Sequence, residues 1–443
     1  PALVAEDGVP IVAMGCMGVG VVLLVAALAA ADSGDLELIS LKDSHPDAVC
    51  NDGTPSGYYF REAQSAEGNS TWVVYLEAGG WCWHAASCAA RCSRHPYFCS
   101  SSSWELTLRH GGLLSSTSPA LHASLRHANK AFVRYCTSDA HMGDATAFGV
   151  EFRGQRVVQA VLSELVETHG LGSDGGHRLL FGGGSAGARG AMVHLDYVPD
   201  MLGDVAANVE ASGFPKVGFY YAVMQWKAWS TQVVGFLDSP LWLDMPSLNR
   251  RAFHGFGEQT RKIHSFANVA HLDDGCAATY PTAQWKCMLG EYRMPFVQSP
   301  YMIVAALHDA FQLDGLALGR LDTDAGLDLA VEFANRTAAT LGKLAGPGHV
   351  VVGMACHTHA ESLTDEGFFW HSTRDGRTQC SVLQTFLGLE RGGGGREYLD
   401  ECRHLDCGVG CSSLPELFGA CPPSSQLGFL VRVAAVAALR ALW

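Results

Sequence analysis

The sequence predicts an α/β fold: a mostly parallel sheet with covering helices and disulfide-rich loops. Strand and helix signals alternate from Thr71 to Ala355, and no Pro- or Ser-rich linker interrupts them. One apolar strand runs directly into a G-x-S-x-G turn, and two later apolar strands end in His and Asp residues. With 48% apolar and only 17% charged residues, the chain is globular with a large core, and a disordered protein is excluded. We therefore expect one large domain, over residues 32–426.

The first informative strand is Thr71–Glu77, which ends in Ala78-Gly79-Gly80-Trp81. Two adjacent glycines after an early strand let backbone N–H groups converge on one point, as in the oxyanion loops of esterases. The alternative is an ordinary turn. The insert that follows, from Cys82 to His110, is rich in Ser and Cys and predicts a disulfide-pinned loop near the site.

The G-x-S-x-G turn follows the strand Leu179–Gly184 and places Ser185 between strand and helix. Glycines permit the sharp corner, and the helix from Ala188 to about Tyr197 points its N-terminus at the serine. A serine held this way is typically a nucleophile, and the N–H of Ala186 joins those of Gly79 and Gly80 in a predicted oxyanion hole. In a chain with 50 glycines, the motif alone could also be a simple glycine-rich turn.

Partners for the serine follow in the chain order Ser, Asp, His that α/β-hydrolases use. The apolar strand Tyr301–Leu307 is followed by His308 and Asp309, and the strand His349–Ala355 is followed by Cys356-His357-Thr358-His359. Parallel strands bring such residues to one sheet edge, where a histidine takes the serine proton and a carboxylate fixes its tautomer. The pattern predicts Ser185, Asp309 and one histidine of the last pair as catalytic. Amphipathic stretches at 155–169 and 327–344 predict covering helices.

Cysteine usage indicates an exported protein. Cys16 lies in an apolar N-terminal segment, and the other fourteen predict about seven disulfides, whose connectivity the sequence does not determine. Clustered Cys and His could instead bind zinc, but paired C-x-x-C knuckles are missing, so we expect no metal and no other cofactor. Asn69 and Asn335 begin Asn-X-Thr/Ser triplets that predict glycosylation of an exported chain.

The two ends of the chain carry apolar segments. Residues 1–31 predict a cleaved signal peptide, with a retained membrane anchor as the alternative, since about 22 apolar residues could span a bilayer. Residues 427–443 contain Arg432 and Arg440 and predict an amphipathic helix rather than a spanning segment.

Several blocks together resemble the pectin acetylesterase / Notum family, in the order of that family and across about residues 45–380. They are Ala48–Thr54, Val74–Cys82, Val133–Asp139, Phe152–Arg156, Gly183–Gly187, His308–Gln312 and Cys356–His359. The resemblance implies an extracellular α/β-hydrolase that cleaves carboxylic esters: acetyl groups on plant cell-wall polysaccharide, or a fatty acyl group on a secreted signalling protein in animals. It also implies His359 as the base instead of His357, and a Cys50–Cys136 disulfide.

Three positions depart from the family pattern. Ala78 replaces a glycine before Gly79, which leaves Gly79 and Gly80 as the expected donors. Ala188 replaces a glycine after Gly187, where we expect its methyl group to pack beneath a helix. The family carries an aspartate after the strand that follows the serine turn and its helix. We expect this position at 209–214, which reads Val-Glu-Ala-Ser-Gly-Phe and contains no aspartate.

The sequence determines the type of reaction more closely than it determines the substrate. Trp81 and Trp83, with the aromatic residues Phe214, Phe219, Tyr220, Tyr221, Trp226 and Trp229, could stack on sugars, line an acyl tunnel, or belong to the core. A net charge of −14 excludes nucleic acid as a partner and disfavours polyanionic pectin. We expect an esterase acting on acylated polysaccharide; the alternatives are a deacylase of longer acyl groups on a protein or lipid, and an inactive extracellular binding protein.

Overall fold

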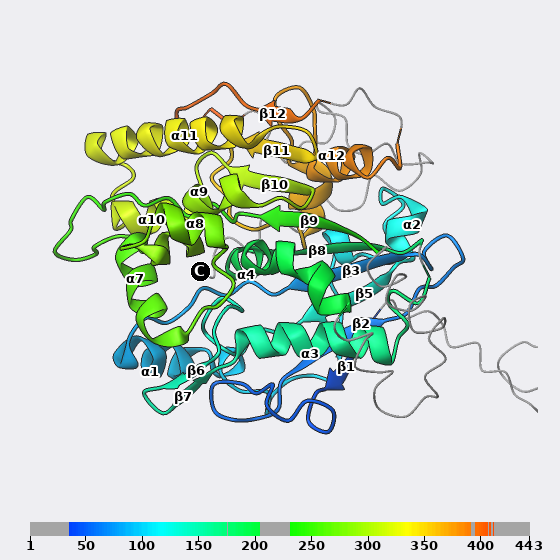
Figure 1. Ribbon diagram of the computed structural model, residues 1–443. Helices are drawn as coiled ribbons and strands as arrows, with labels where there is room; N and C mark the ends of the chain where they lie inside the picture. The colour runs from blue at the N-terminus through cyan, green and yellow to red at the C-terminus, as the bar shows by residue number, and fades with distance from the viewer. Residues whose placement is uncertain are drawn as a thin grey trace, which may run out of the picture. The chain divides into compact units, whose positions relative to one another are not determined.

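The computed structural model describes residues 35–174, 176–203, 231–390, 395–405, 407–408 and 411. The segments 1–31 and 427–443, and the aromatic residues named above between Phe214 and Trp229, lie outside these residues. Within the described part, a ten-stranded sheet has the order β12-β11-β10-β9-β8-β3-β5-β2-β1-β4 (Figure 1). The strands of this sheet are β1 (Leu36–Ser40), β2 (Gly57–Arg61), β3 (Thr71–Leu76), β4 (Thr107–Leu108), β5 (Asn129–Val133), β8 (Arg178–Gly184), β9 (Gln232–Asp238), β10 (Tyr301–Ala306), β11 (His349–Met354) and β12 (Glu397–Leu399). A separate two-stranded sheet consists of β6 (Ala145–Ala147) and β7 (Val150–Phe152).

Seven neighbouring strands, from β12 to β5, run parallel, and β2, β1 and β4 continue the sheet with antiparallel pairs. The central strands β3, β9, β10 and β11 are buried almost throughout, which is why their sequences are apolar runs without alternation. The predicted α/β class is therefore confirmed.

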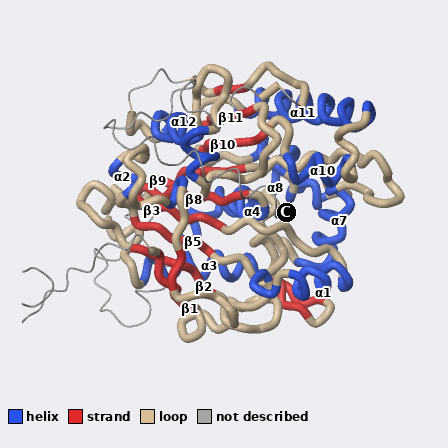
Figure 2. Tube along the Cα trace, turned by 180° about the vertical axis from the view of Figure 1, so that it is seen from behind, coloured by secondary structure: helices blue, strands red, loops and turns tan. Residues whose placement is uncertain are grey.

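Helices cover both faces of the sheet. They are α1 (Ala85–Arg94), α2 (Ala123–Arg126), α3 (Gly154–Glu167), α4 (Ala186–His194), α7 (Phe256–Ala267), α8 (Asp274–Thr279), α9 (Gly290–Arg293), α10 (Ala310–Ala317), α11 (Asp324–Leu344) and α12 (Gln379–Phe386). Alternate strand residues enter two core clusters: Val74 belongs to the cluster that includes residues of α3, α4 and α11, whereas Val73 belongs to the cluster that includes residues of α2 and α12. Figure 1 shows α3 and α4 in front of the sheet, and Figure 2 shows the molecule from behind.

The predicted covering helices agree with α3 and α11, but two local expectations were wrong. The insert after Cys82 is not only a loop, because it contains α1, which begins with a capping box between His84 and Ser87. The strand that follows the elbow helix in the described part is β9, and it ends in Asp238. The expected departure at 209–214 was therefore a misplacement of the strand: the aspartate is present, and 209–214 lies outside the described residues.

Disulfides connect the loops around this sheet. The structure contains six of them in its described part: Cys50–Cys136, Cys82–Cys88, Cys92–Cys99, Cys276–Cys287, Cys356–Cys411 and Cys402–Cys407. The first is the pairing that the family resemblance implies. None of the described helices is both long and apolar enough to cross a bilayer.

Candidate active site

Ser185 lies on a strained corner between β8 and α4. Its backbone has φ 53° and ψ −115°, a conformation that non-glycine residues rarely adopt, and its N–H donates to the Asp238 carbonyl at 2.8 Å. The glycines on either side are required by contact as well as by conformation. A Cβ on Gly187 would lie 1.9 Å from the Leu76 carbonyl oxygen, and one on Gly183 would lie 2.5 Å from the Gly187 carbonyl carbon. The corner therefore holds the Ser185 hydroxyl at the carboxyl edge of the sheet.

The structure brings Ser185, His359 and Asp309 into one hydrogen-bonded chain. His359 Nε2 lies 2.7 Å from Ser185 Oγ, and His359 Nδ1 lies 2.8 Å from Asp309 Oδ2. Ser185 is 4% exposed and Asp309 3% exposed. This arrangement can transfer a proton from the hydroxyl to the imidazole while the carboxylate fixes the tautomer.

Asp309 is held from two directions. It follows β10 and is the N-cap of α10, so its Oδ1 accepts a hydrogen bond from the Gln312 N–H at 2.9 Å. The Ala310 N–H donates to the carbonyl of Thr358, which joins the acid loop to the histidine loop. The carboxylate therefore has a fixed orientation toward His359.

The histidine loop is anchored by the end of β9, which the sequence analysis did not identify as part of the site. Ser239 Oγ accepts from the Ala360 N–H at 3.1 Å, and the Asp238 carboxylate accepts from the Ser362 N–H at 2.8 Å. Asp238 is buried, and burial raises the pKa of its carboxyl despite the hydrogen bonds from Ser362 and Ser239. The family aspartate expected after this strand was the signal that could have located this anchor.

The charge around His359 favours its protonated form. Burial by itself lowers the pKa of His359, but the Asp309 carboxylate and its hydrogen bond, together with Asp238 and Glu361, raise it above the ordinary value. His357 lies apart from this chain, with Nε2 3.3 Å from Asp314 Oδ1 near the surface.

The glycine loop after β3 lies beside the elbow, because Leu76 pairs with Gly183 in the sheet. Gly79 has φ 147° and Gly80 has φ 67°, so both adopt backbone conformations that favour glycine. The N–H groups of Gly79, Gly80 and Ala186 have no hydrogen-bond acceptor among the residues that the structure describes. These are the three donors expected for an oxyanion.

Glu77 fixes the start of this loop. Its buried carboxylate accepts from Arg134 Nη1 at 2.5 Å and from the Tyr135 N–H at 2.8 Å. Burial raises the pKa of Glu77 to about 7, although Arg134 and the Tyr135 N–H both lower it.

Large aromatic rings pack beside His359 and α4. The Phe311 ring stacks on the His359 imidazole, with centroids 5.2 Å apart, and lies 5.5 Å from the ring of Trp242. The Arg189 guanidinium of α4 is fully buried and lies 3.6 Å from the Trp81 ring centroid and 4.2 Å from that of Trp242. Trp81 and Trp242 are thus core residues, whereas Phe311 is 45% exposed.

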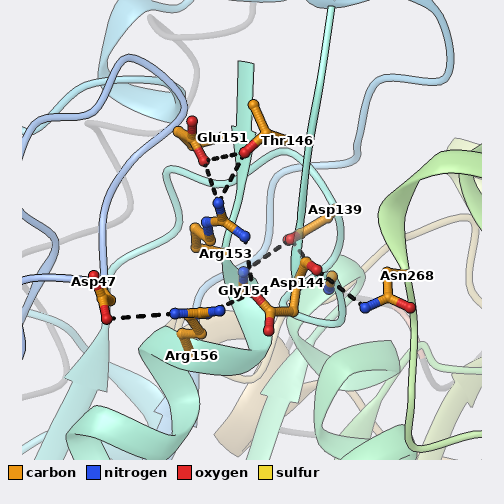
Figure 3. Close-up of polar contacts among 10 residues, drawn as sticks. Asp47, Asp139, Asp144, Thr146, Glu151, Arg153, Gly154, Arg156 and Asn268 are labelled. Carbon is orange, nitrogen blue, oxygen red and sulfur yellow. Dashed lines mark hydrogen bonds and ion pairs between the residues drawn. The ribbon is translucent and has the colours of Figure 1, made fainter. Parts of the chain in front are cut away.

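The loop after β5 connects to α3 through Asp139 (Figure 3). The buried Asp139 carboxylate accepts from the N–H groups of Gly154 at 2.8 Å and Gly143 at 3.1 Å. A Cβ on Gly154 would lie 2.4 Å from Asp139 Oδ1, so glycine is required at this contact. Beside it, Arg153 and Arg156 both donate to Asp144. These contacts join two of the sequence blocks that carried the family resemblance.

The remaining predicted residues are not part of the hydrogen-bonded chain of Ser185, His359 and Asp309. Trp83 is half-buried and packs edge-on against His84, at 5.7 Å between ring centroids. Asn69 and Asn335 are exposed, so both remain predicted glycosylation sites. No cluster of three His, Cys, Asp or Glu side chains suited to a metal ion occurs within the described ranges.

Comparison with known proteins places this geometry in a family. The chain is 27% identical over 283 residues to palmitoleoyl-protein carboxylesterase notum1a of Danio rerio, covering 63% of this chain and 51% of that protein. It is 29% identical over 276 residues to pectin acetylesterase 5 of Arabidopsis thaliana, covering 60% and 55%. The chain thus spans about half the length of the curated relatives it matches.

The fold is similar to a solved structure entitled "Structure of the Wnt deacylase Notum from Drosophila", with a TM-score of 0.71 and 24% identity, covering 85% of this chain and 99% of that one. A family profile described as Pectinacetylesterase matches residues 29–379. The chain therefore belongs to the pectinacetylesterase family.

Proposed function

We propose that this protein is a serine carboxylesterase that works through an acyl-enzyme on Ser185. The observation that carries the proposal is the hydrogen-bonded chain of Ser185, His359 and Asp309 at a strained strand-to-helix corner. Relatives named as carboxylesterases and a pectin acetylesterase support the same reaction class.

The chemistry proceeds in two half-reactions. His359 Nε2 takes the proton of Ser185 as Oγ attacks the ester carbonyl, and Asp309 stabilises the imidazolium. The N–H groups of Gly79, Gly80 and Ala186 donate to the oxyanion, and the alcohol leaves with the proton from His359. Water activated by His359 then attacks the acyl-enzyme, releasing the carboxylic acid and restoring the Ser185 hydroxyl.

We propose that the acyl group is a short one, such as acetyl on a polysaccharide. Phe311 stacks on His359, and Trp242 and Trp81 fill the space beside α4 around the Arg189 guanidinium. These rings favour a small acyl site, and Phe311 at the exposed rim can stack on a sugar. The net charge of −14 disfavours a polyanionic pectin and favours a less charged polymer.

A second candidate is a deacylase that removes a longer acyl group from a protein or lipid. The names of several relatives, which are palmitoleoyl-protein carboxylesterases, favour it. We propose an extracellular location for either activity, because the six disulfides among the described residues and two exposed glycosylation triplets suit an oxidising compartment. Residues 1–31 would supply the export signal or a membrane anchor.

Active-site labelling tests the proposed nucleophile. Wild-type protein should react with a fluorophosphonate probe at Ser185 and hydrolyse p-nitrophenyl acetate, and Ser185→Ala should lose both reactions while keeping its thermal unfolding midpoint. Labelling of the wild type at another residue, or equal turnover by Ser185→Ala, would place the nucleophile elsewhere. A folded wild type with neither reaction would favour an inactive extracellular binding protein.

A further inference from the structure

The glycine loop after β3, which contains Gly79 and Gly80 and is called the oxyanion loop below, is held by a side chain from α1. This helix takes no part in the chemistry described above. Arg91 Nη1 donates to the Gly79 carbonyl at 2.5 Å, and Arg91 Nε donates to Ser138 Oγ at 2.9 Å. Its guanidinium also lies 4.6 Å from the Phe98 ring centroid and 5.3 Å from that of Tyr135. The guanidinium is therefore fixed in position by two hydrogen bonds and two aromatic rings.

The carbonyl that Arg91 holds belongs to the peptide that carries the Gly80 N–H. In a trans peptide the C=O and the N–H point in opposite directions. A donor that fixes the Gly79 carbonyl on one side of the loop therefore aims the Gly80 N–H toward the other side. Neither glycine has a Cβ to restrict this peptide, and both have positive φ, so the orientation depends on external contacts.

Two further carbonyls of the loop, those of Glu77 and Gly80, have side-chain partners as well. His141 Nε2 lies 2.9 Å from the Glu77 carbonyl oxygen, and the Tyr135 hydroxyl donates to the Gly80 carbonyl at 2.8 Å. In contrast, the N–H groups of Gly79 and Gly80 have no acceptor among the described residues. The protein thus occupies three loop carbonyls and leaves these two donors available.

Two short disulfides fix the helix that presents Arg91. Cys82–Cys88 joins the end of the oxyanion loop to α1, and Cys92–Cys99 joins the residue after Arg91 to the Phe98 turn. These cross-links close loops with sequence separations of only 6 and 7 residues, so they position local structure more than they constrain the whole chain.

Resting on the proposed esterase function, we infer that Arg91 is a positioning residue, which orients the Gly79–Gly80 peptide so that the Gly80 N–H donates to the oxyanion. Arg91 does not touch the substrate; it acts through the backbone that does. Loss of Arg91 should therefore weaken transition-state stabilisation and leave substrate binding and the His359 proton transfer largely intact.

The test compares Arg91→Met and Arg91→Lys with Arg94→Met, which changes an exposed arginine on the same helix. Removing a whole oxyanion donor costs about 10²- to 10³-fold in kcat, so mispositioning one should cost about 10- to 100-fold in Arg91→Met. On p-nitrophenyl acetate we expect KM to change less than about threefold, and Arg94→Met to match the wild type. Fluorophosphonate labelling at saturation counts folded active sites, so each kcat is expressed per competent molecule.

Two readouts separate positioning from a purely structural role. Guanidinium ion at a non-denaturing concentration should restore part of the Arg91→Met activity, and the pH midpoint of kcat/KM should stay at the wild-type value. If Arg91→Met does not fold, Arg91→Lys provides the comparison, with an expected loss of at least about fivefold, because an ammonium cannot reproduce both guanidinium hydrogen bonds.

Arg91 variants with the kcat of Arg94→Met, in a wild type that shows Ser185-dependent turnover, would overturn the inference and leave the proposed function standing. A shifted pH midpoint together with a normal labelling rate would also overturn it. Absence of Ser185-dependent turnover in the wild type would instead overturn the proposed function, and this inference with it.

Discussion

At the residue scale, Ser185 shows how local strain places the reacting atom. Its φ of 53° costs about 1–3 kcal/mol for a residue with a Cβ. Two backbone hydrogen bonds offset this cost. The Ser185 N–H donates to the Asp238 carbonyl, and the Ser185 carbonyl accepts from the Arg189 N–H in the first turn of α4. The strained corner presents Oγ to His359 at 2.7 Å.

The two neighbouring histidines should differ sharply on substitution. His359→Ala should lower kcat by about 10³-fold or more, because the general base is removed, whereas His357→Ala should stay within about threefold of the wild type. His357 is the matched control, since it lies two positions away and contacts Asp314 at the surface. Turnover of p-nitrophenyl acetate measures both, and the reverse ranking would mean that His357 is the base.

The pH dependence of kcat/KM should follow the titration of His359. Its imidazole must be neutral to accept the Ser185 proton, and its pKa is raised above the ordinary value of 6.5 by Asp309, Asp238 and Glu361. Activity should therefore be lost as the pH falls through a midpoint above 6.5 and be restored as the pH rises. Initial rates across the pH range measure this profile of kcat/KM. A midpoint below pH 6.5 would contradict the effect of these charges on the His359 pKa.

The residue types and chain order of the site could be predicted from the sequence, because the glycine-flanked serine lies between an apolar strand and a helix, and an Asp and a His follow later apolar strands in the order that α/β-hydrolases use. The residues alone left His357 and His359 equivalent; only the family resemblance separated them. Asp238 was missed since the next strand was expected near 209–214, whereas β9 begins at Gln232. A side chain that acts through backbone contacts, such as Arg91, leaves no motif at all.

At the element scale, β3 and α4 touch so closely that the elbow glycine is part of their packing. Gly187→Ala should lower the free energy of unfolding by about 3 kcal/mol or more, because its Cβ would lie 1.9 Å from the Leu76 carbonyl oxygen. Gly346→Ala is the matched control, since no atom lies within 4 Å of a Cβ built there. Urea unfolding measures both changes; an equally small effect of the two substitutions would contradict this packing.

The helices and strands were predicted with unequal success for a physical reason. Buried parallel strands such as β10 and β11 are continuous apolar runs, so their positions follow from the sequence. In contrast, α1 has one buried residue, Cys88, and consists of Ala, Ser, Cys and Arg, so it lacks the large apolar side chains that indicate a core-facing helix. Its stability comes from a cap at His84 and from the disulfides Cys82–Cys88 and Cys92–Cys99. The pairing of these cysteines does not follow from their spacing in the sequence.

At the scale of the whole molecule, the disulfides differ in the length of chain that they close. Cys50–Cys136 has a sequence separation of 86 residues, and Cys276–Cys287 of 11. By loop entropy, replacing both cysteines of the first pair with alanine should cost about 4–5 kcal/mol, compared with about 3 kcal/mol for the second. Chemical denaturation of the two double variants measures the difference, and a smaller effect of the long-range pair would show that the loop-entropy account fails for this fold.

The proposed function is that of a serine esterase with a small acyl site, and an ester series tests it most directly. We would measure the hydrolysis of p-nitrophenyl esters from acetate to palmitate by the wild type, with Ser185→Ala as the control. We expect Ser185-dependent turnover that is greatest for acetate and falls steeply beyond butyrate. A maximum at eight carbons or longer would contradict the small acyl site, and no Ser185-dependent turnover at any length would contradict the esterase itself.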